Sequence, residues 1–208
     1  MQRPDDDRYF TEQELRDMKF RSLGTDVLIA RTCRLYVPEY ISIGDRTVID
    51  DFCVISGNID FGANVHIAHG CRVIAGREGV KMADFSGLAF DVTIFAQSDD
   101  YSGASMTNPT VPMKYRNISR GRVEIGRHAI IGAGTIIFPG VNVGEGASVG
   151  AASMVTKALE PWTVNFGAPT KRLRQREKTM LALEKQYLEE LGLSAPPPSP
   201  SVDSAQAK

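Results

Sequence analysis

Aliphatic and aromatic residues recur at every sixth position along much of this 208-residue chain. They form three blocks of marker residues, which are Ile43, Ile49, Ile55, Phe61, Ile67 and Val73, then Met82, Leu88 and Ile94, and finally Ile125, Ile131, Ile137, Val143, Val149 and Val155. Small or β-branched residues occur four places after most markers, as Cys53 and Ala129 do. A period of six fits neither an α-helix of about 3.6 residues per turn nor a strand that alternates every second residue.

This period is typical of short strands joined by tight corners, in which the marker fills the interior and a small residue eases the turn. Three hexapeptides close a triangular coil, and successive coils stack about 4.8 Å apart. Residues one coil apart then share a face, so Cys53 should stack on Cys71 and Thr135 on Ser153. The pattern therefore predicts an all-β solenoid, a parallel β-helix of hexapeptide repeats over residues 24–170.

The two ends of the chain leave this period. Residues 1–23 should form an N-terminal arm with a short cap helix, in which Thr11 is the N-cap and Glu14 completes a capping box. Residues 171–192 carry apolar side chains on one side of a helical repeat and predict a C-terminal helix. The tail over 193–208 is rich in Pro, Ser and Ala and is expected to be disordered.

The repeat is also interrupted over residues 97–122, which are polar and contain Pro109 and Pro112. A loop of this length on a compact scaffold is usually functional or disordered. We expect it to leave the solenoid as an extruded loop. Its role as part of an acceptor pocket or as a clasp between subunits is left open by the sequence.

Charge and cysteine content narrow the function classes. The chain has 24 Lys and Arg against 25 Asp and Glu, so no overall basic field indicates nucleic-acid binding. It has no run of about 18 apolar residues, so no membrane insertion is expected. Its three cysteines form neither a disulfide framework nor a zinc pattern, which favours reduced thiols in a cytoplasmic protein.

The segments "IGAGT", "VTK" and "FGAPTKRLR" resemble the hexapeptide-repeat acyltransferases, among them the galactoside and maltose O-acetyltransferases. The resemblance covers roughly residues 24–176. It implies a left-handed β-helix, a homotrimer and acetyl-CoA as co-substrate, without a metal. It also implies that the 97–122 loop leans over a neighbouring subunit.

The same resemblance suggests where the coenzyme binds. Ala133, Gly134 and Ala151 match turns whose backbone holds the pantetheine. Further residues match those near the adenosine phosphate end, and they are Thr156, Lys157, Lys171 and Arg174. For Lys171 and Arg174, the alternative is that they lie on a solvated basic face of the C-terminal helix. Trp162 could stack on adenine, although packing against the C-terminal helix is favoured.

Acyl transfer requires a base to take the acceptor's proton, and histidine suits this role near neutral pH. The six-residue phase points His66, His69 and His128 away from the core. The chain lacks a "GxSxG" nucleophile, so direct transfer is expected rather than a covalent acyl-enzyme.

Two resemblances rank these histidines differently. The "VHIA" and "SDDYSG" segments resemble bacterial sugar O-acetyltransferases, which implies His66 as the base, oriented by Asp99 or Asp100 from the loop, in one subunit or across a seam. The "HIAHGC" segment resembles the acyltransferases of lipid A synthesis, which implies His69. Galactoside-type enzymes keep their own catalytic histidine at the place of Asp99, so the match to them is incomplete.

The loop also offers Tyr101, Ser102 and Asn108 as acceptor contacts, although each could simply shape the loop. The sequence thus predicts an acetyl-CoA-dependent acetyltransferase acting on a sugar, sugar nucleotide or polysaccharide precursor, with O-acetylation favoured over N-acetylation. One alternative is a γ-carbonic anhydrase-like metal site, but the required histidine pair is missing around His128. The other is a non-catalytic trimeric assembly module.

Overall fold

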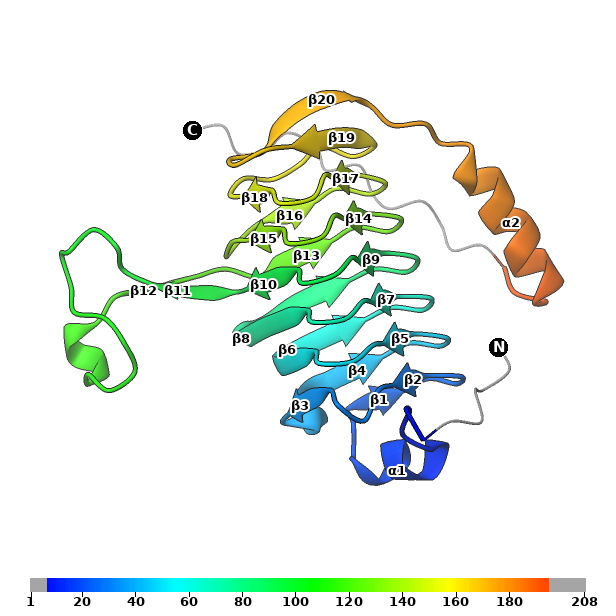
Figure 1. The fold of residues 1–208 in the computed structure, drawn as a ribbon, viewed down its shortest axis with the longest axis horizontal. Helices are drawn as coiled ribbons and strands as arrows, with labels where there is room; N and C mark the ends of the chain where they lie inside the picture. The colour runs from blue at the N-terminus through cyan, green and yellow to red at the C-terminus, as the bar shows by residue number, and fades with distance from the viewer. Residues whose placement is uncertain (1–6, 195–208) are drawn as a thin grey trace. The chain divides into compact units, whose positions relative to one another are not determined.

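The structure is a computed structural model in which residues 7–194 are described. The chain divides into two compact units, Met1–Arg176 and Glu177–Lys208. The first unit is a left-handed parallel β-helix whose triangular coils stack along one axis (Figure 1). The fold class predicted from the six-residue period is therefore confirmed.

One flat face of the prism is an eight-stranded sheet that ends in a single antiparallel pair. Its strands, in order along the axis, are β2 (Leu28–Ile29), β5 (Val48–Ile49), β7 (His66–Ile67), β9 (Gly87–Leu88), β14 (Ile130–Ile131), β17 (Ser148–Val149), β19 (Thr163–Phe166) and β20 (Lys171–Gln175).

The other two faces form one ten-stranded sheet, because the long strands β6 and β8 run through a corner of the prism. The members are β1 (Ser22–Leu23), β3 (Arg34–Tyr36), β4 (Ile41–Ile43), β6 (Val54–Phe61), β8 (Arg72–Met82), β10 (Thr93–Phe95), β13 (Val123–Ile125), β15 (Ile136–Ile137), β16 (Asn142–Val143) and β18 (Met154–Val155). A 3-10 turn, η1 (Pro38–Tyr40), leads into β4.

Strand register bears out the predicted coil length. Val48 pairs with His66 on the next coil, eighteen positions further on. The pairing of Val54 with Arg72 sets Cys53 beside Cys71, as expected. The second expected stack is also found, since the Ser153 backbone N–H donates to the Thr135 hydroxyl over 3.4 Å.

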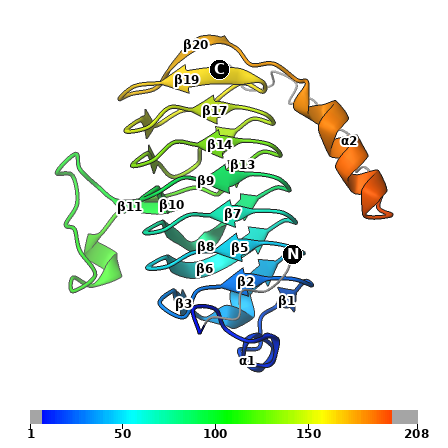
Figure 2. The same ribbon diagram turned by 45° about the vertical axis from the view of Figure 1, so that its right-hand side comes forward.

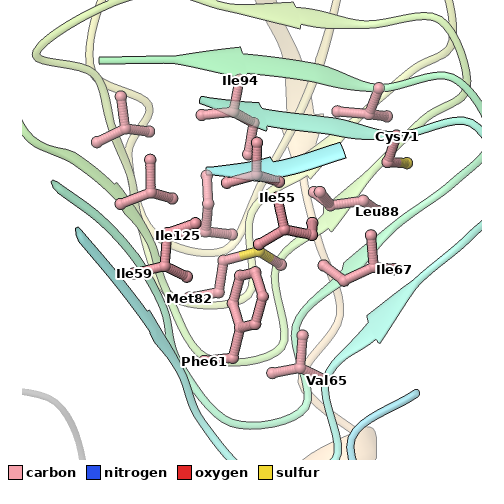
Figure 3. Packing of buried hydrophobic residues seen from close by; sticks show 14 of the residues in the cluster. Ile55, Ile59, Phe61, Val65, Ile67, Cys71, Met82, Leu88, Ile94 and Ile125 are labelled. Carbon is pink, nitrogen blue, oxygen red and sulfur yellow. The ribbon is translucent and has the colours of Figure 1, made fainter. Parts of the chain in front are cut away.

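The markers of the repeat build the core. Each of them is at most 4 % exposed, and the small residues four places later are buried beside them. Figure 3 shows Phe61, Ile67 and Met82 meeting in the interior of the prism. The coils approach so closely that a Cβ on Gly132 would lie 2.5 Å from the Ala151 nitrogen, which explains the glycine that follows many markers.

The cap helix α1 (Glu12–Asp17) has the predicted start. The Thr11 hydroxyl accepts from the Glu14 backbone N–H, and the Glu14 carboxylate accepts from the Thr11 N–H in return. Leu15 is buried in the cluster that fills the first coils. The helix therefore covers the apolar end of the solenoid.

The C-terminal prediction needs a correction. Residues 171–175 form strand β20, paired antiparallel with β19, and the helix α2 (Met180–Glu190) begins only after them. The reason is that β19 presents an open sheet edge, and pairing with it outweighs the local helical preference of this segment. Residues 195–208 of the predicted tail lie outside the described residues. Residues 1–6 of the N-terminal segment lie outside them as well.

The predicted loop over 97–122 leaves the solenoid as an arm, seen protruding in both Figure 1 and Figure 2. Its stem is a two-stranded antiparallel ladder of β11 (Gln97–Asp99) and β12 (Ile118–Arg120). A 3-10 turn, η2 (Met113–Tyr115), lies near its outer end. The arm is thus more regular than the sequence indicated.

Candidate active site

One corner of the prism aligns His69, one of the two candidate bases, with the predicted coenzyme turns. Backbone hydrogen bonds of 2.7 to 3.0 Å run from coil to coil there. They join Gly70 to Asp51, Asp91 to His69, Gly134 to Phe90, and Ala152 to Ala133. We call this column of residues the His69 corner. It carries Ala133, Gly134 and Ala151 as well as His69, so four of the predicted site residues share one edge of the prism.

His66 lies on β7, on the face that leads into this corner. Its Nε2 is 2.9 Å from Oδ2 of Asp50, a carboxylate whose side chain is only 11 % exposed. The imidazole itself is 57 % exposed, and its pairing neighbour on β9 is Gly87, which has no side chain. An open imidazole held by a buried carboxylate is the arrangement of a general base and its orienting group.

His69 has a different environment, because Arg8 from the N-terminal segment reaches it. The Arg8 Nη2 lies 3.0 Å from His69 Nε2. The same guanidinium pairs with Asp50 at 3.2 Å and with Asp51 at 2.8 Å. Asp51 also accepts from the Thr32 hydroxyl over 2.7 Å. Both carboxylates are therefore bound to a cation beside the two histidines.

The Thr32 hydroxyl bond, and after it Arg8, hold the pKa of Asp51 below its ordinary value. The hydrogen bond to Asp51 in turn raises the pKa of Arg8. Each of these two groups thus favours the charged form of the other. The sequence reasoning missed Arg8, Asp50 and Asp51, although the coil length placed Asp51 directly beneath His69.

Asp99 and Asp100 do not meet His66 within the chain. Asp99 pairs with Arg116 at 3.0 Å and accepts from the Asn108 backbone N–H. Asp100 accepts from the backbone N–H of Ser102. The Arg116 guanidinium lowers the pKa of Asp99, and the bonds from Ser102 lower that of Asp100. Within one chain both carboxylates stabilise turns of the arm, and Asp50 is the carboxylate that lies next to His66.

The predicted acceptor contacts also lie on the arm. Tyr101 is 93 % exposed, and the Ser102 hydroxyl accepts from the Ala104 backbone N–H. The Asn108 side chain accepts from the Thr110 backbone N–H over 3.0 Å. Ser102 and Asn108 thus shape the arm in the single chain, and their contact with an acceptor stays a prediction.

A hollow of about 390 Å³ lies at the C-terminal end of the solenoid, between β18 and the β19–β20 pair. Thr156, Lys157 and Lys171 line it, three of the four residues predicted near the coenzyme's phosphates. Arg174 does not line it, and Arg172 does, paired with Glu160 at 2.7 Å. Lys171 pairs with Phe166, whereas Arg174 pairs with Val164 beyond a register shift in the β19–β20 ladder, so Arg174 lies further along the strand from the hollow.

The third histidine lies at a different corner. His128 is only 8 % exposed, with its ring stacked on Phe85 at 5.2 Å and 6.3 Å from the Trp162 ring. Phase alone placed it outward, but aromatic residues of neighbouring coils cover it. Trp162 is buried, and its ring fills the space where a side chain on Gly146 would stand, while its packing against the C-terminal helix stays a prediction.

Within residues 7–194, no group of three or more His, Cys, Asp and Glu side chains has a geometry that could hold a metal ion. No described helix is long and apolar enough to cross a membrane.

Comparisons with known proteins identify the family of the chain. No protein-family model matches the sequence. The chain is 41 % identical over 182 residues to the dTDP-4-amino-4,6-dideoxy-D-glucose acyltransferase of Escherichia coli, covering 86 % of this chain and 94 % of that protein. The chain belongs to the hexapeptide-repeat acyltransferases. As in that family, the enzyme uses an acyl-coenzyme A as co-substrate.

Solved structures support the same assignment for this acyltransferase. AntD, an N-acyltransferase from Bacillus cereus solved with dTDP and 3-hydroxybutyryl-CoA, is 37 % identical with a TM-score of 0.88, over 90 % of this chain and 100 % of that one. A variant of AntD solved with dTDP-4-amino-4,6-dideoxyglucose and coenzyme A is 38 % identical with a TM-score of 0.87, over 88 % and 98 %. A maltose O-acetyltransferase from Clostridium difficile, at 24 % identity, shares the fold.

Proposed function

We propose that this acyltransferase transfers an acetyl group from acetyl-CoA to the 4-amino group of a dTDP-linked 4-amino-4,6-dideoxy sugar. The observation that carries the proposal is the 41 % identity to the Escherichia coli enzyme over nearly its whole length. AntD, solved with the dTDP-amino sugar, supports the same acceptor class. The proposal replaces the O-acetylation favoured by the sequence with N-acetylation. Of the sugar, sugar nucleotide and polysaccharide precursor that the sequence allowed, it selects the sugar nucleotide.

The chemistry needs one base and one charge-stabilising surface. The acceptor amine attacks the thioester carbonyl, so a C–N bond forms while the C–S bond breaks. His66 takes the amine proton and passes it to the leaving thiolate, and Asp50 holds the imidazole 2.9 Å away. Backbone N–H groups of the corner turns that are not used between coils would stabilise the oxyanion.

The coenzyme is proposed to follow the His69 corner. Its pantetheine would pass Ala133, Gly134 and Ala151, and its phosphates would reach the hollow lined by Thr156, Lys157 and Lys171. Support comes from the alignment of these turns along one edge and from two lysines at its far end. Arg174, which does not line the hollow, has no such support.

A homotrimer is proposed to complete the site. The arm carries exposed apolar side chains, namely Met106, Met113 and Tyr115, and the His69 corner exposes Phe52 and Phe90. A neighbour's arm docked over this corner would cover both sets. It would also bring Asp99, Asp100, Tyr101, Ser102 and Asn108 to the acceptor.

The buried cysteines are consistent with a cytoplasmic enzyme. Cys33, Cys53 and Cys71 are free thiols, and burial raises the pKa of Cys33 to about 12, so that thiol is unreactive. Two thiols on adjacent coils that stay unpaired suit a reducing compartment.

Thiol release from acetyl-CoA tests the proposal, with dTDP-4-amino-4,6-dideoxyglucose, dTDP-glucose and UDP-N-acetylglucosamine as acceptors and 3-hydroxybutyryl-CoA as a second donor. We expect turnover with the amino sugar alone, and mass spectrometry should place the acyl group on nitrogen. Turnover with dTDP-glucose would contradict the amine assignment. Coenzyme binding without turnover on any acceptor would favour the assembly module. Light scattering of the same sample tests the trimer.

A further inference from the structure

The N-terminal segment places an arginine beside the two candidate histidines. The Arg8 carbonyl accepts from the Arg31 backbone N–H over 2.8 Å, and Tyr9 bridges to Ala30 in antiparallel fashion. These bonds fix Arg8 against the first coil. From there its side chain crosses to the corners of the next two coils, where it meets Asp50, Asp51 and His69.

The contact between Arg8 and His69 determines where the His69 proton lies. A guanidinium only donates hydrogen bonds, so the His69 Nε2 that faces it must accept. The proton of the neutral ring is then on Nδ1, which lies 3.5 Å from Oδ2 of Asp50. The two ring nitrogens therefore differ, since Nε2 accepts from Arg8 while the buried Nδ1 faces Asp50 electrostatically and without a hydrogen bond. Neither has a lone pair free to take a proton from an acceptor.

His66 has the complementary arrangement. Its Nε2 faces Oδ2 of Asp50, while the other oxygen of Asp50 faces the Arg8 guanidinium. A carboxylate only accepts, so His66 carries its proton on Nε2 and keeps the Nδ1 lone pair. Arg8 therefore acts on both rings, on His69 directly and on His66 through Asp50.

We propose that Arg8 is a positioning residue that assigns the base function to Nδ1 of His66. It does so by occupying His69 and by fixing the carboxylate that orients His66. The proposal deepens the proposed function and rests on it for the identity of the reaction. The tautomers of the two rings, however, can be measured without substrate and do not depend on which reaction the enzyme catalyses.

The charges around His66 give the inference a pH signature. The ionisable groups of this cluster are Arg8, Tyr9, Asp50, Asp51 and His69. Removing the positive charge of Arg8 leaves the two carboxylates uncompensated. The neighbouring imidazoles then bind a proton more readily. The acidic limb of the kcat/KM profile should therefore move to higher pH in Arg8→Gln.

The matched control is Arg31→Gln. Arg31 belongs to the first coil that anchors the same segment, and it pairs with Glu14 at 2.8 Å rather than with the histidine cluster. We expect Arg8→Gln to lower kcat about tenfold and to shift the acidic limb upward. Arg8→Lys should restore the limb but not the full rate, because an ammonium lacks the planar fork. Arg31→Gln should lower stability while keeping the pH profile of wild type.

A second readout does not depend on turnover. The chain has three histidines, so nitrogen-15 labelling of histidine gives three ring systems whose tautomers NMR distinguishes. We expect Nδ1–H for His69 and Nε2–H for His66, and loss of the His69 preference in Arg8→Gln. Unchanged tautomers in Arg8→Gln, or an equal pH shift in Arg31→Gln, would overturn the inference. Expected tautomers with no turnover on amino sugars would instead refute the proposed function.

Discussion

The His69 corner and the corner that carries His128 arise from the same six-residue repeat but differ in chemistry. At the first, His69 is 42 % exposed among Arg8, Asp50 and Asp51. At the second, His128 is 8 % exposed between aromatic rings. Both histidines leave the core, yet only the first keeps wide access to solvent.

The six-residue repeat determines whether a corner side chain points out of the core. The residues of the neighbouring coils determine its chemical environment. A corner side chain meets residues one coil above and below. At His128 those neighbours are Phe85 and the Trp162 ring, which exclude water. At His69 they are Asp51 and Phe90, and a residue from outside the repeat, Arg8, adds a charge. A corner becomes a site when polar neighbours meet on it.

The largest expected effect comes from removing the aromatic packing of the His128 corner. Trp162 is 6 % exposed, so Trp162→Ala should cost about 3–5 kcal/mol of unfolding free energy. Chemical denaturation measures this cost, with Tyr36→Ala, an exposed aromatic, as the control expected to change stability by less than about 0.5 kcal/mol. The kcat of folded Trp162→Ala should match wild type. A lost kcat would mean that this corner takes part in the reaction.

A smaller effect is expected from the His128 ring itself. His128 has a φ of 59°, which asparagine tolerates well. His128→Asn therefore keeps the backbone and removes the ring that stacks on Phe85 and lies beside Trp162, at a cost of about 1 kcal/mol. Thermal unfolding and steady-state kinetics check both parts. A clear loss of kcat in folded His128→Asn would contradict the distinction between the two corners.

The smallest effect concerns the cap that precedes the first coil and depends on pH. Arg31 and then Thr11 lower the pKa of Glu14 from an ordinary 4.5 to about 2. A lowered carboxylate pKa stabilises the fold above pH 4.5, and this contribution is lost as pH falls toward 2. Glu14→Gln should lower the Tm modestly at pH 7, and the difference from wild type should shrink by pH 2. An equal Tm difference at both pH values would contradict this account.

The sequence predicted the fold well because the solenoid is periodic. Each marker, such as Ile67 or Val149, meets the same environment as its equivalents on other coils, so position in the hexad determines burial. The capping box at Thr11 is equally local. The strand at 171–175 was missed because its partner, β19, is an open edge created only by the folded solenoid.

The site was predicted less completely because its contacts join different coils. The phase correctly predicted that His66 and His69 leave the core, while their role as a base stays a prediction. Asp50 could have been found by the coil length, since it lies one coil below Ala68. Arg8 could not, because it comes from a segment outside the repeat. Within one chain the loop carboxylates Asp99 and Asp100 hold turns of the arm, and their approach to His66 from a neighbouring subunit stays a prediction.

The steady-state kcat of His66→Ala decides whether His66 is the general base. It is measured beside His69→Ala with saturating acetyl-CoA and dTDP-4-amino-4,6-dideoxyglucose. Losing a general base costs about 100-fold or more, so His66→Ala should fall by at least that factor. His69→Ala should lose about tenfold or less, because it removes only a partner of Asp50 and Arg8. A kcat that survives in His66→Ala and collapses in His69→Ala would contradict the account and transfer the base function to His69.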